Sequence, residues 1–186
     1  TAIQCVKTII TDLAVMDVTP AGLVLREVAP GFTPEEVQQV NLPRLVFVNK
    51  MDRVGANFDA VLEDLRVTLG AEPLVLCFPV GAEDQFHGVV DLLTGRYLRW
   101  AAGGDGAEIV DEEIPTTEVE RFQRYRQQLL DALAAEDDSV LAAFLDGREL
   151  AIEDLKRVLR QGTLRRKFYP VFAGASLRNI GIQPLL

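Results

Sequence analysis

A short apolar run that ends in an Asn-Lys-x-Asp tetrapeptide constrains the fold of this chain most strongly. Residues 45–48 read Leu-Val-Phe-Val, and the polar residues that follow are Asn49, Lys50 and Asp52. A short apolar run of this kind is typical of a strand buried on both faces of a parallel sheet. Polar side chains at the carboxyl end of such a strand lie where open α/β sheets bind their ligands. The segment therefore predicts an α/β fold with a binding loop at one edge of the sheet.

The three polar side chains have the chemistry that recognition of guanine requires. The Asp52 carboxylate can accept hydrogen bonds from the ring NH and the exocyclic amine together, a pair of donors that adenine does not offer. Asn49 can bond the other edge of the purine or tie neighbouring loops together, and the Lys50 methylenes can cover the face of the ring. Such a tetrapeptide occurs by chance in roughly a few per cent of chains of this length, so the preceding strand is what supports the interpretation.

Around this motif the sequence resembles the elongation factor G family of translational GTPases. The resemblance extends from Asn41 to Leu186 and is carried by collinear segments at residues 42–53, 55–57, 69–73, 78–81, 86–93, 170–174 and 179–186. It implies the second half of a GTP-binding domain, interrupted by an inserted subdomain, and a role in ribosomal translocation. Two alternatives stay open: a paralogous peptide-release or ribosome-protection GTPase, and a noncatalytic protein-interaction module whose guanine motif is vestigial.

The resemblance also implies a second guanine loop, which follows Gly174 and consists of Ala175, Ser176 and Leu177. Relatives have Ser-Ala-Leu or Ser-Ala-Lys there, with backbone NH groups that point at the guanine carbonyl oxygen. Alanine and serine are exchanged in this chain. A backbone donor survives a change of side chain, so we expect the contact to the base to persist, while the fate of the relatives' serine hydroxyl bond stays open.

The parts that hold phosphates are missing from the sequence. No G-x-x-x-x-G-K-[ST] loop occurs in the 186 residues, and the only histidine, His87, does not stand where the family's catalytic histidine would. Because phosphoryl transfer depends on a phosphate loop, a metal ion and an oriented water, this chain alone is predicted not to hydrolyse GTP. We expect it to bind GTP or GDP weakly or not at all, with Mg²⁺ only in an intact factor, and we expect His87 at a surface turn.

Alternating apolar segments predict a partial P-loop-GTPase-like α/β sheet in three layers, with an inserted α+β subdomain. Residues 1–100 and 162–186 are assigned to the partial GTP-binding domain, with 1–40 matching poorly, and residues 101–161 to a mainly helical insert. Strands are expected at residues 22–28, 45–49, 74–80, 89–93 and 168–173. Helices are expected at residues 58–69, from 116 through 133, and at residues 139–145 and 152–159.

The insert carries most of the negative charge. Residues 101–161 contain fifteen acidic and seven basic side chains, a net −8 within a total of −9. Such a field repels nucleic-acid phosphates and attracts basic protein surfaces, so direct nucleic-acid binding by the insert is not expected. A merely solvated helical face explains the same charge equally well. The resemblance implies contacts with the ribosome, and specifically between this insert and the ribosomal stalk protein.

Cysteine usage and the amino-terminal sequence predict a cytoplasmic protein. Cys5 and Cys77 form neither a C-x-x-C pair nor a disulfide framework, as expected in a reducing compartment. Lys7 and Asp12 interrupt the apolar stretch near the start, which argues against a signal peptide and a membrane helix. No histidine or cysteine cluster indicates zinc.

The strand expected around residues 23–25 raises the question of an open sheet edge. If earlier strands of the sheet are absent, this edge would be covered by residues 3–15 or by another molecule. Self-association through the edge is therefore an expectation.

Overall fold

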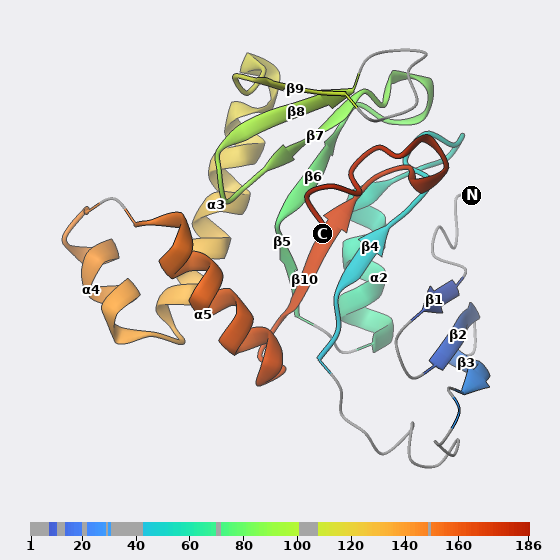
Figure 1. Cartoon of the computed structure of the whole chain (residues 1–186), viewed down its shortest axis with the longest axis horizontal. Coiled ribbons are helices and arrows are strands. Elements are labelled where there is room, and N and C mark those ends of the chain that lie inside the picture. The colour runs from blue at the N-terminus through green and yellow to red at the C-terminus, as the bar shows by residue number, and fades with distance from the viewer. Residues whose placement is uncertain are drawn as a thin grey trace.

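A three-stranded parallel sheet lies at the centre of this computed structural model, which describes residues 8–10, 14–19, 22–28, 30, 43–69, 72–100, 108–148 and 150–186. The strands are β4 (Val46–Val48), β5 (Pro73–Val75) and β10 (Tyr169–Ala173), and their order is β4-β10-β5 (Figure 1). The last strand of the chain thus lies between the two earlier ones. Residues 76–168 leave the parallel sheet after β5, and the chain returns to it at β10.

Helix α2 (Phe58–Leu69) follows the Asn-Lys-x-Asp loop and has the bounds that its spacing predicts. The Asn57 side chain accepts a 3.0 Å hydrogen bond from the backbone N–H of Ala60, which caps the first turn. Four apolar residues recur at helical spacing and are buried: Phe58, Val61, Leu62 and Leu65. This single buried stripe packs the helix against the rest of the core.

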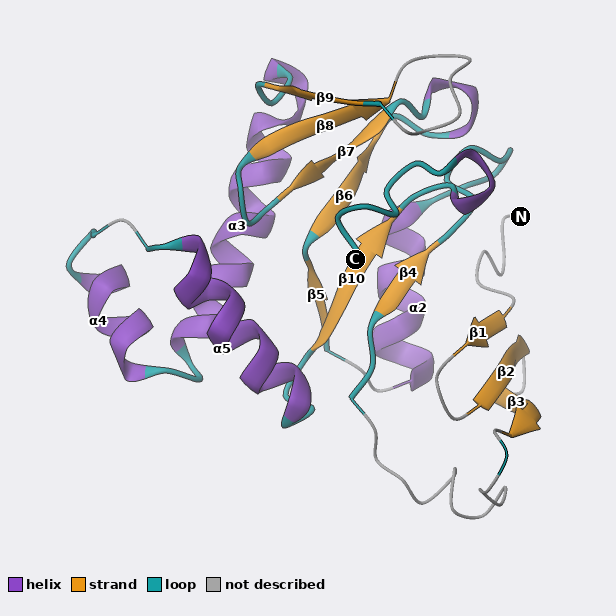
Figure 2. Ribbon diagram, in the orientation of Figure 1, coloured by secondary structure: helices purple, strands orange, loops and turns teal. Residues whose placement is uncertain are grey.

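The strand expected at residues 74–80 is divided in two at Leu76. The Leu76 N–H donates to the Val171 carbonyl oxygen of β10 at 2.8 Å, whereas its own carbonyl oxygen accepts from the Leu92 N–H at 2.9 Å. The chain therefore passes from the parallel sheet into a second, antiparallel sheet. That sheet has the order β6-β7-β8-β9, with β6 (Cys77–Val80), β7 (Gly88–Asp91), β8 (Arg96–Trp100) and β9 (Ile109–Glu112) (Figure 2).

Three helices follow, close to the predicted positions: α3 (Val119–Ala134), α4 (Asp138–Leu145) and α5 (Ile152–Leu164). Tyr125, Leu129 and Leu133 form the buried stripe of α3, and the Tyr125 ring lies 5.5 Å from that of Phe78 in β6. Tyr125 is therefore a core residue. One continuous hydrophobic core joins α2, both sheets and the stripes of α3 and α5.

The α/β class and the mixture of parallel and antiparallel sheets confirm the expected fold class. The four-stranded sheet spans the boundary predicted near residue 101, since β9 pairs with β8. The division into 1–100 with 162–186 and 101–161 stays a prediction. Residues 101–107 lie outside the described part of the chain.

A separate antiparallel sheet near the start has the order β1-β2-β3, with β1 (Thr8–Ile10), β2 (Ala14–Thr19) and β3 (Gly22–Val28). The strand predicted at 22–28 is confirmed, and one of its edges pairs with β2. Residues 31–42 lie outside the described part of the chain. In the portion that the structure describes, no helix is both long enough and apolar enough to cross a bilayer.

Candidate functional site

The Asn-Lys-x-Asp loop begins with an abrupt change of backbone direction at the end of β4. Val48 is fully buried in the parallel sheet, and Lys50 has a φ of 63°, in the left-handed region that non-glycine residues rarely adopt. Met51 then returns to the core, with 2 % of its surface exposed, while Asp52 is only half-buried. Met51 is therefore anchored in the core, and the carboxylate of Asp52 lies at the rim of the sheet.

The second predicted loop lies directly beside the first, because β10 and β4 are adjacent parallel strands. The Gly174 N–H donates to the Val48 carbonyl oxygen at 3.0 Å, and the Met51 N–H donates to the Gly174 carbonyl oxygen at 3.0 Å. A side chain at position 174 would not fit: a Cβ there would lie 2.3 Å from the Ile180 carbonyl oxygen and 2.6 Å from Cζ of Phe47. Glycine is thus required for the two loops to approach so closely.

The side chains of Asn49 and Ser176 connect the two loops. The Asn49 Nδ2 donates to the Ser176 hydroxyl at 2.8 Å, and the Ser176 backbone N–H donates to the Asn49 Oδ1 at 2.9 Å. The same Oδ1 also accepts from the Lys50 N–H at 2.8 Å. The structure therefore has the loop-tying contact that the sequence offered as one of two roles for Asn49. The other Nδ2 hydrogen has no acceptor among the described residues and is available to a ligand.

The serine hydroxyl of the second loop stands at position 176, where it accepts a hydrogen bond from Asn49. Of the loop amides, that of Ala175 donates to the Ile180 carbonyl oxygen at 2.9 Å, and that of Ser176 is bonded to Asn49. Among the described residues, the Leu177 amide has no acceptor. This amide is the one that a ligand can use without displacing a bond inside the protein.

The Asp52 carboxylate makes no hydrogen bond or ion pair with any described residue, although its neighbour Met51 is bonded to the Gly174 turn. A half-buried carboxylate without a partner fits a ligand that presents two donors, as the guanine edge does. Lys50 is exposed beside it. The predicted residues therefore meet at one edge of the sheet, with acceptor, donor and amide groups still available.

Behind the first loop, a contact that no sequence motif indicates joins α2 to α3. The Tyr125 hydroxyl donates to Asp59 Oδ1 at 2.6 Å, and Arg121 lies 3.4 Å from the other carboxylate oxygen. Burial raises the pKa of the Tyr125 phenol, and the hydrogen bond to Asp59 raises it further. The only sequence signal is that Arg121 and Tyr125 are four residues apart, on one face of a helix.

His87 takes no part in this site. It is exposed between β6 and β7 and is held there by its backbone. Its backbone N–H donates to the Val80 carbonyl oxygen at 3.3 Å, and its carbonyl oxygen accepts from the backbone N–H of Trp100 at 3.2 Å. The predicted surface position is confirmed. Within the described ranges, no group of three histidine, cysteine, aspartate or glutamate side chains is arranged to hold a metal ion.

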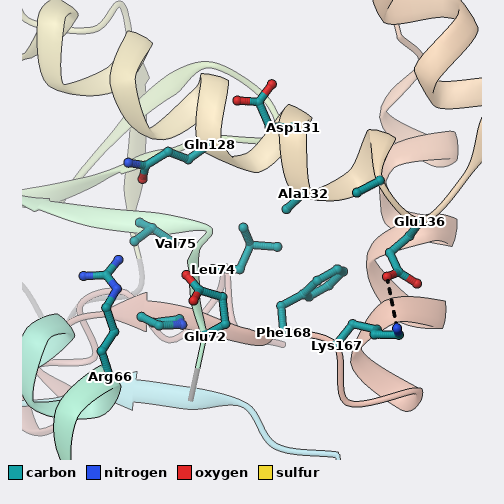
Figure 3. A pocket seen from close by; sticks show the side chains of 12 residues that line it. Arg66, Glu72, Leu74, Val75, Gln128, Asp131, Ala132, Glu136, Lys167 and Phe168 are labelled. Atoms are coloured by element: carbon teal, nitrogen blue, oxygen red, sulfur yellow. Dashed lines mark ion pairs between the residues drawn. The ribbon is translucent and has the colours of Figure 1, made fainter. Parts of the chain in front are cut away.

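A groove of about 440 Å³ lies at the other end of the parallel sheet (Figure 3). It is lined by Arg66, Glu72, Pro73, Leu74, Val75, Gln128, Asp131, Ala132, Ala135, Glu136, Lys167 and Phe168. Lys167 pairs with Glu136 across its rim at 3.9 Å. Pro73 begins β5 and Phe168 precedes β10, so the groove is at the amino ends of these strands, whereas the two loops are at the carboxyl ends of β4 and β10.

Comparison with known proteins identifies the family. The family model of the elongation factor Tu GTP binding domain matches residues 33–186. The chain belongs to this family. A crystal structure of a Thermus thermophilus protein is similar to this member of the elongation factor Tu GTP-binding-domain family, with a TM-score of 0.67 and 34 % identity over 81 % of the chain. The chain spans 22 % of the length of that protein.

Membership in the elongation factor Tu GTP-binding-domain family confirms the coarse expectation of a translational GTPase and of guanine nucleotide binding within the family. The described residues fit the base of such a nucleotide, since an unpartnered carboxylate and a free amide lie at adjoining loops. They do not offer the G-x-x-x-x-G-K-[ST] loop that cradles phosphates, which is absent from the whole sequence.

Proposed function

We propose that this chain supplies the guanine-recognition half and the inserted subdomain of an elongation factor G-like translational GTPase that acts in ribosomal translocation in the cytoplasm. Asp52 reads the ring NH and the amine, Lys50 covers the ring, Asn49 orients the loop, and the loop of Ala175, Ser176 and Leu177 supplies an amide to the guanine carbonyl oxygen. The observation that carries the proposal is the Asn49–Ser176 connection, which brings both loops to one sheet edge.

Hydrolysis needs parts that this sequence does not contain. The phosphate loop, Mg²⁺ and catalytic histidine belong to an intact factor, so the isolated chain binds GDP or GTP weakly and shows negligible turnover. What its own residues provide is selection of the base. Tight GTP binding with turnover by the isolated chain would contradict this division of roles.

Calorimetric titration with GDP and XDP tests the proposal directly. Asp52→Asn replaces an acceptor with an amide that can pair with the additional carbonyl group of xanthine, so the preference for GDP over XDP is expected to reverse. Asp64→Asn is the matched control, because Asp64 is exposed on α2 and makes no hydrogen bond or ion pair with a described residue. Equal affinities for GDP and XDP in both the wild type and the Asp52 variant would refute guanine recognition by this loop.

A second candidate is a noncatalytic interaction module whose acidic insert binds the ribosomal stalk protein. Its support is that several exposed acids of the insert have no basic partner among the described residues: Glu113, Glu120, Asp138 and Glu153. Such a surface attracts a basic protein and repels phosphates. Binding to the stalk protein that weakens with salt and with a Glu120→Lys/Asp138→Lys/Glu153→Lys variant, without any affinity for GDP, would favour this candidate.

A further inference from the structure

The connection between β6 and β7 forms a second contact with the Asn-Lys-x-Asp loop, in addition to that of the Gly174 turn. Its contact residue is Glu83, in a short 3-10 turn (Glu83–Gln85). The Glu83 N–H donates to the Met51 carbonyl oxygen at 2.9 Å, and the Glu83 Oε1 accepts from the Gly55 N–H at 2.7 Å. Met51 and Gly55 flank Asp52 in the sequence, so a single residue binds the loop on both sides of the base-reading carboxylate.

The backbone around Glu83 is specialised for this contact. Glu83 has a φ of 58°, in the left-handed region that is unfavourable for a residue with a side chain. The preceding turn depends on Gly81, since a Cβ there would lie 1.9 Å from the Gln85 carbonyl oxygen. Phe86, which is fully buried, anchors the other end. A strained conformation of this kind persists only where its surroundings over-determine it, and such positions cluster at functional sites.

We propose that Glu83 is a positioning residue for base recognition, and that it acts through Met51 and Gly55 to fix where Asp52 stands. The inference rests on the proposed function. Asp52 has no side-chain partner of its own among the described residues, so the position of its carboxylate depends on the backbone that carries it. A carboxylate that must meet two donors at once tolerates little displacement. The Gly174 turn fixes the loop before Asp52, and Glu83 alone among the described side chains bonds it after Asp52.

Three variants separate the positioning role of the Glu83 side chain from the effect of its charge. Glu83→Ala removes the acceptor for Gly55, whereas Glu83→Gln keeps a carbonyl oxygen of similar reach and removes only the charge. Asp84→Ala is the matched control, since Asp84 is an exposed carboxylate in the same turn without a described contact. One readout is the hydrogen-exchange rate of the Gly55 amide, measured by NMR. The other is the ratio of GDP to IDP affinity, because IDP lacks only the amine that takes the second bond of Asp52.

Glu83→Ala is expected to accelerate exchange at Gly55 about tenfold and to lower the GDP-to-IDP ratio about fivefold, as loss of one hydrogen bond and of its alignment predicts. Glu83→Gln and Asp84→Ala are expected to stay within about twofold of the wild type in both readouts. Unchanged exchange in Glu83→Ala overturns the proposal. So does faster exchange with an unchanged affinity ratio, since Glu83 would then hold the loop without positioning Asp52.

The two proposals fail in different ways. If the wild type does not distinguish GDP from IDP, guanine recognition itself is refuted, and the role of Glu83 falls with it. If the wild type prefers GDP and Glu83→Ala keeps that preference in full, guanine recognition stands and only the positioning role is refuted.

Discussion

The hydroxyl of Tyr125 in α3 donates a 2.6 Å hydrogen bond to the carboxylate of Asp59 in the first turn of α2. Arg121, one turn earlier in α3, reaches the same carboxylate at 3.4 Å and donates to the Pro79 carbonyl oxygen of β6 at 3.2 Å. Its guanidinium also lies 4.8 Å from the centre of the Phe78 ring. Helix α3 is therefore bonded both to α2, which follows the first loop, and to β6, which leads to Glu83.

Tyr125→Phe removes one hydroxyl from this junction and leaves the ring in place. The expected loss is about 1 kcal/mol in the free energy of unfolding, since Asp59 keeps only its longer contact with Arg121. Urea denaturation measures it. Tyr169→Phe is the control, because the Tyr169 hydroxyl bonds to no described residue, and an equal loss in both variants would contradict a specific role for the Tyr125–Asp59 bond.

Asn49→Ala removes the three hydrogen bonds of the Asn49 side chain, two of which connect the first loop to Ser176 while the third lies within the loop. We expect a loss of about 1–2 kcal/mol in the free energy of unfolding, together with faster amide exchange at Lys50 and Ser176. Ser176→Ala removes only the hydroxyl acceptor and should cost less. A larger effect of the serine change than of the asparagine change would show that the amide of Asn49 is not what connects the loops.

Gly174→Ala tests the close approach of the two loops. The added methyl would overlap the Ile180 carbonyl oxygen and the Phe47 ring. We therefore expect the free energy of unfolding, measured with heat or urea, to fall by about 2–4 kcal/mol. Gly147→Ala is the control: Gly147 has a φ of 66° but no atom within 4 Å of the added Cβ, and its cost should be only about 1 kcal/mol. Similar costs at both positions would contradict a steric requirement for glycine at position 174, because Gly174 does not have the positive φ that Gly147 has.

Asp137 makes the stability of the insert depend on pH in the acid range. It caps α4 by accepting from the N–H groups of Ser139 and Val140 at 2.9 and 3.2 Å, and it pairs with Arg157 of α5 at 2.9 Å. Hydrogen bonds from the Ser139 hydroxyl and from Arg157 hold the pKa of Asp137 well below its usual range. The folded state thus binds a proton at Asp137 less readily than the unfolded state does.

The direction of the pH dependence follows from the lowered pKa of Asp137. The stabilising contribution of Asp137 is complete above the unfolded pKa, about 3.9, and is lost as the pH falls from there toward the lower folded pKa. Asp137→Asn should therefore flatten the decline of unfolding free energy below about pH 4, and Asp137→Ala should cost about 1 kcal/mol at neutral pH through the lost cap. Asp138→Asn, at an exposed neighbour, is the control, and an identical acid profile for all variants would refute the linkage.

Local patterns explain which elements the sequence predicts well. Helix α2 has both a helical stripe and an Asn57 cap, and strands β4 and β10 are continuous apolar runs, so each is determined by its own residues. Strand β9 is different, because its four residues are mostly exposed and form a strand by pairing with β8. Arg96 contacts Asp111 at 2.5 Å and Arg99 contacts Glu112 at 2.6 Å. Such pairs depend on register, which no single segment reveals.

The residues of the candidate site also divide into those that a local motif predicts and those that it does not. Asn49, Lys50 and Asp52 belong to one contiguous motif, and the loop at Ala175 follows from resemblance. Their contact across 127 positions follows from the adjacency of β4 and β10. Glu83 and Asp59 belong to no motif, since each acts through a bond to a residue that is remote in the sequence. Only the fold brings these partners together.

Leu76 has a consequence for motion. Its amide belongs to one sheet and its carbonyl to the other, so the chain passes from β5 into β6 without an intervening loop. We therefore expect the parallel and the four-stranded sheets to move together at this point. A displacement of the four-stranded sheet is then expected to reach β5 and β10 through the backbone.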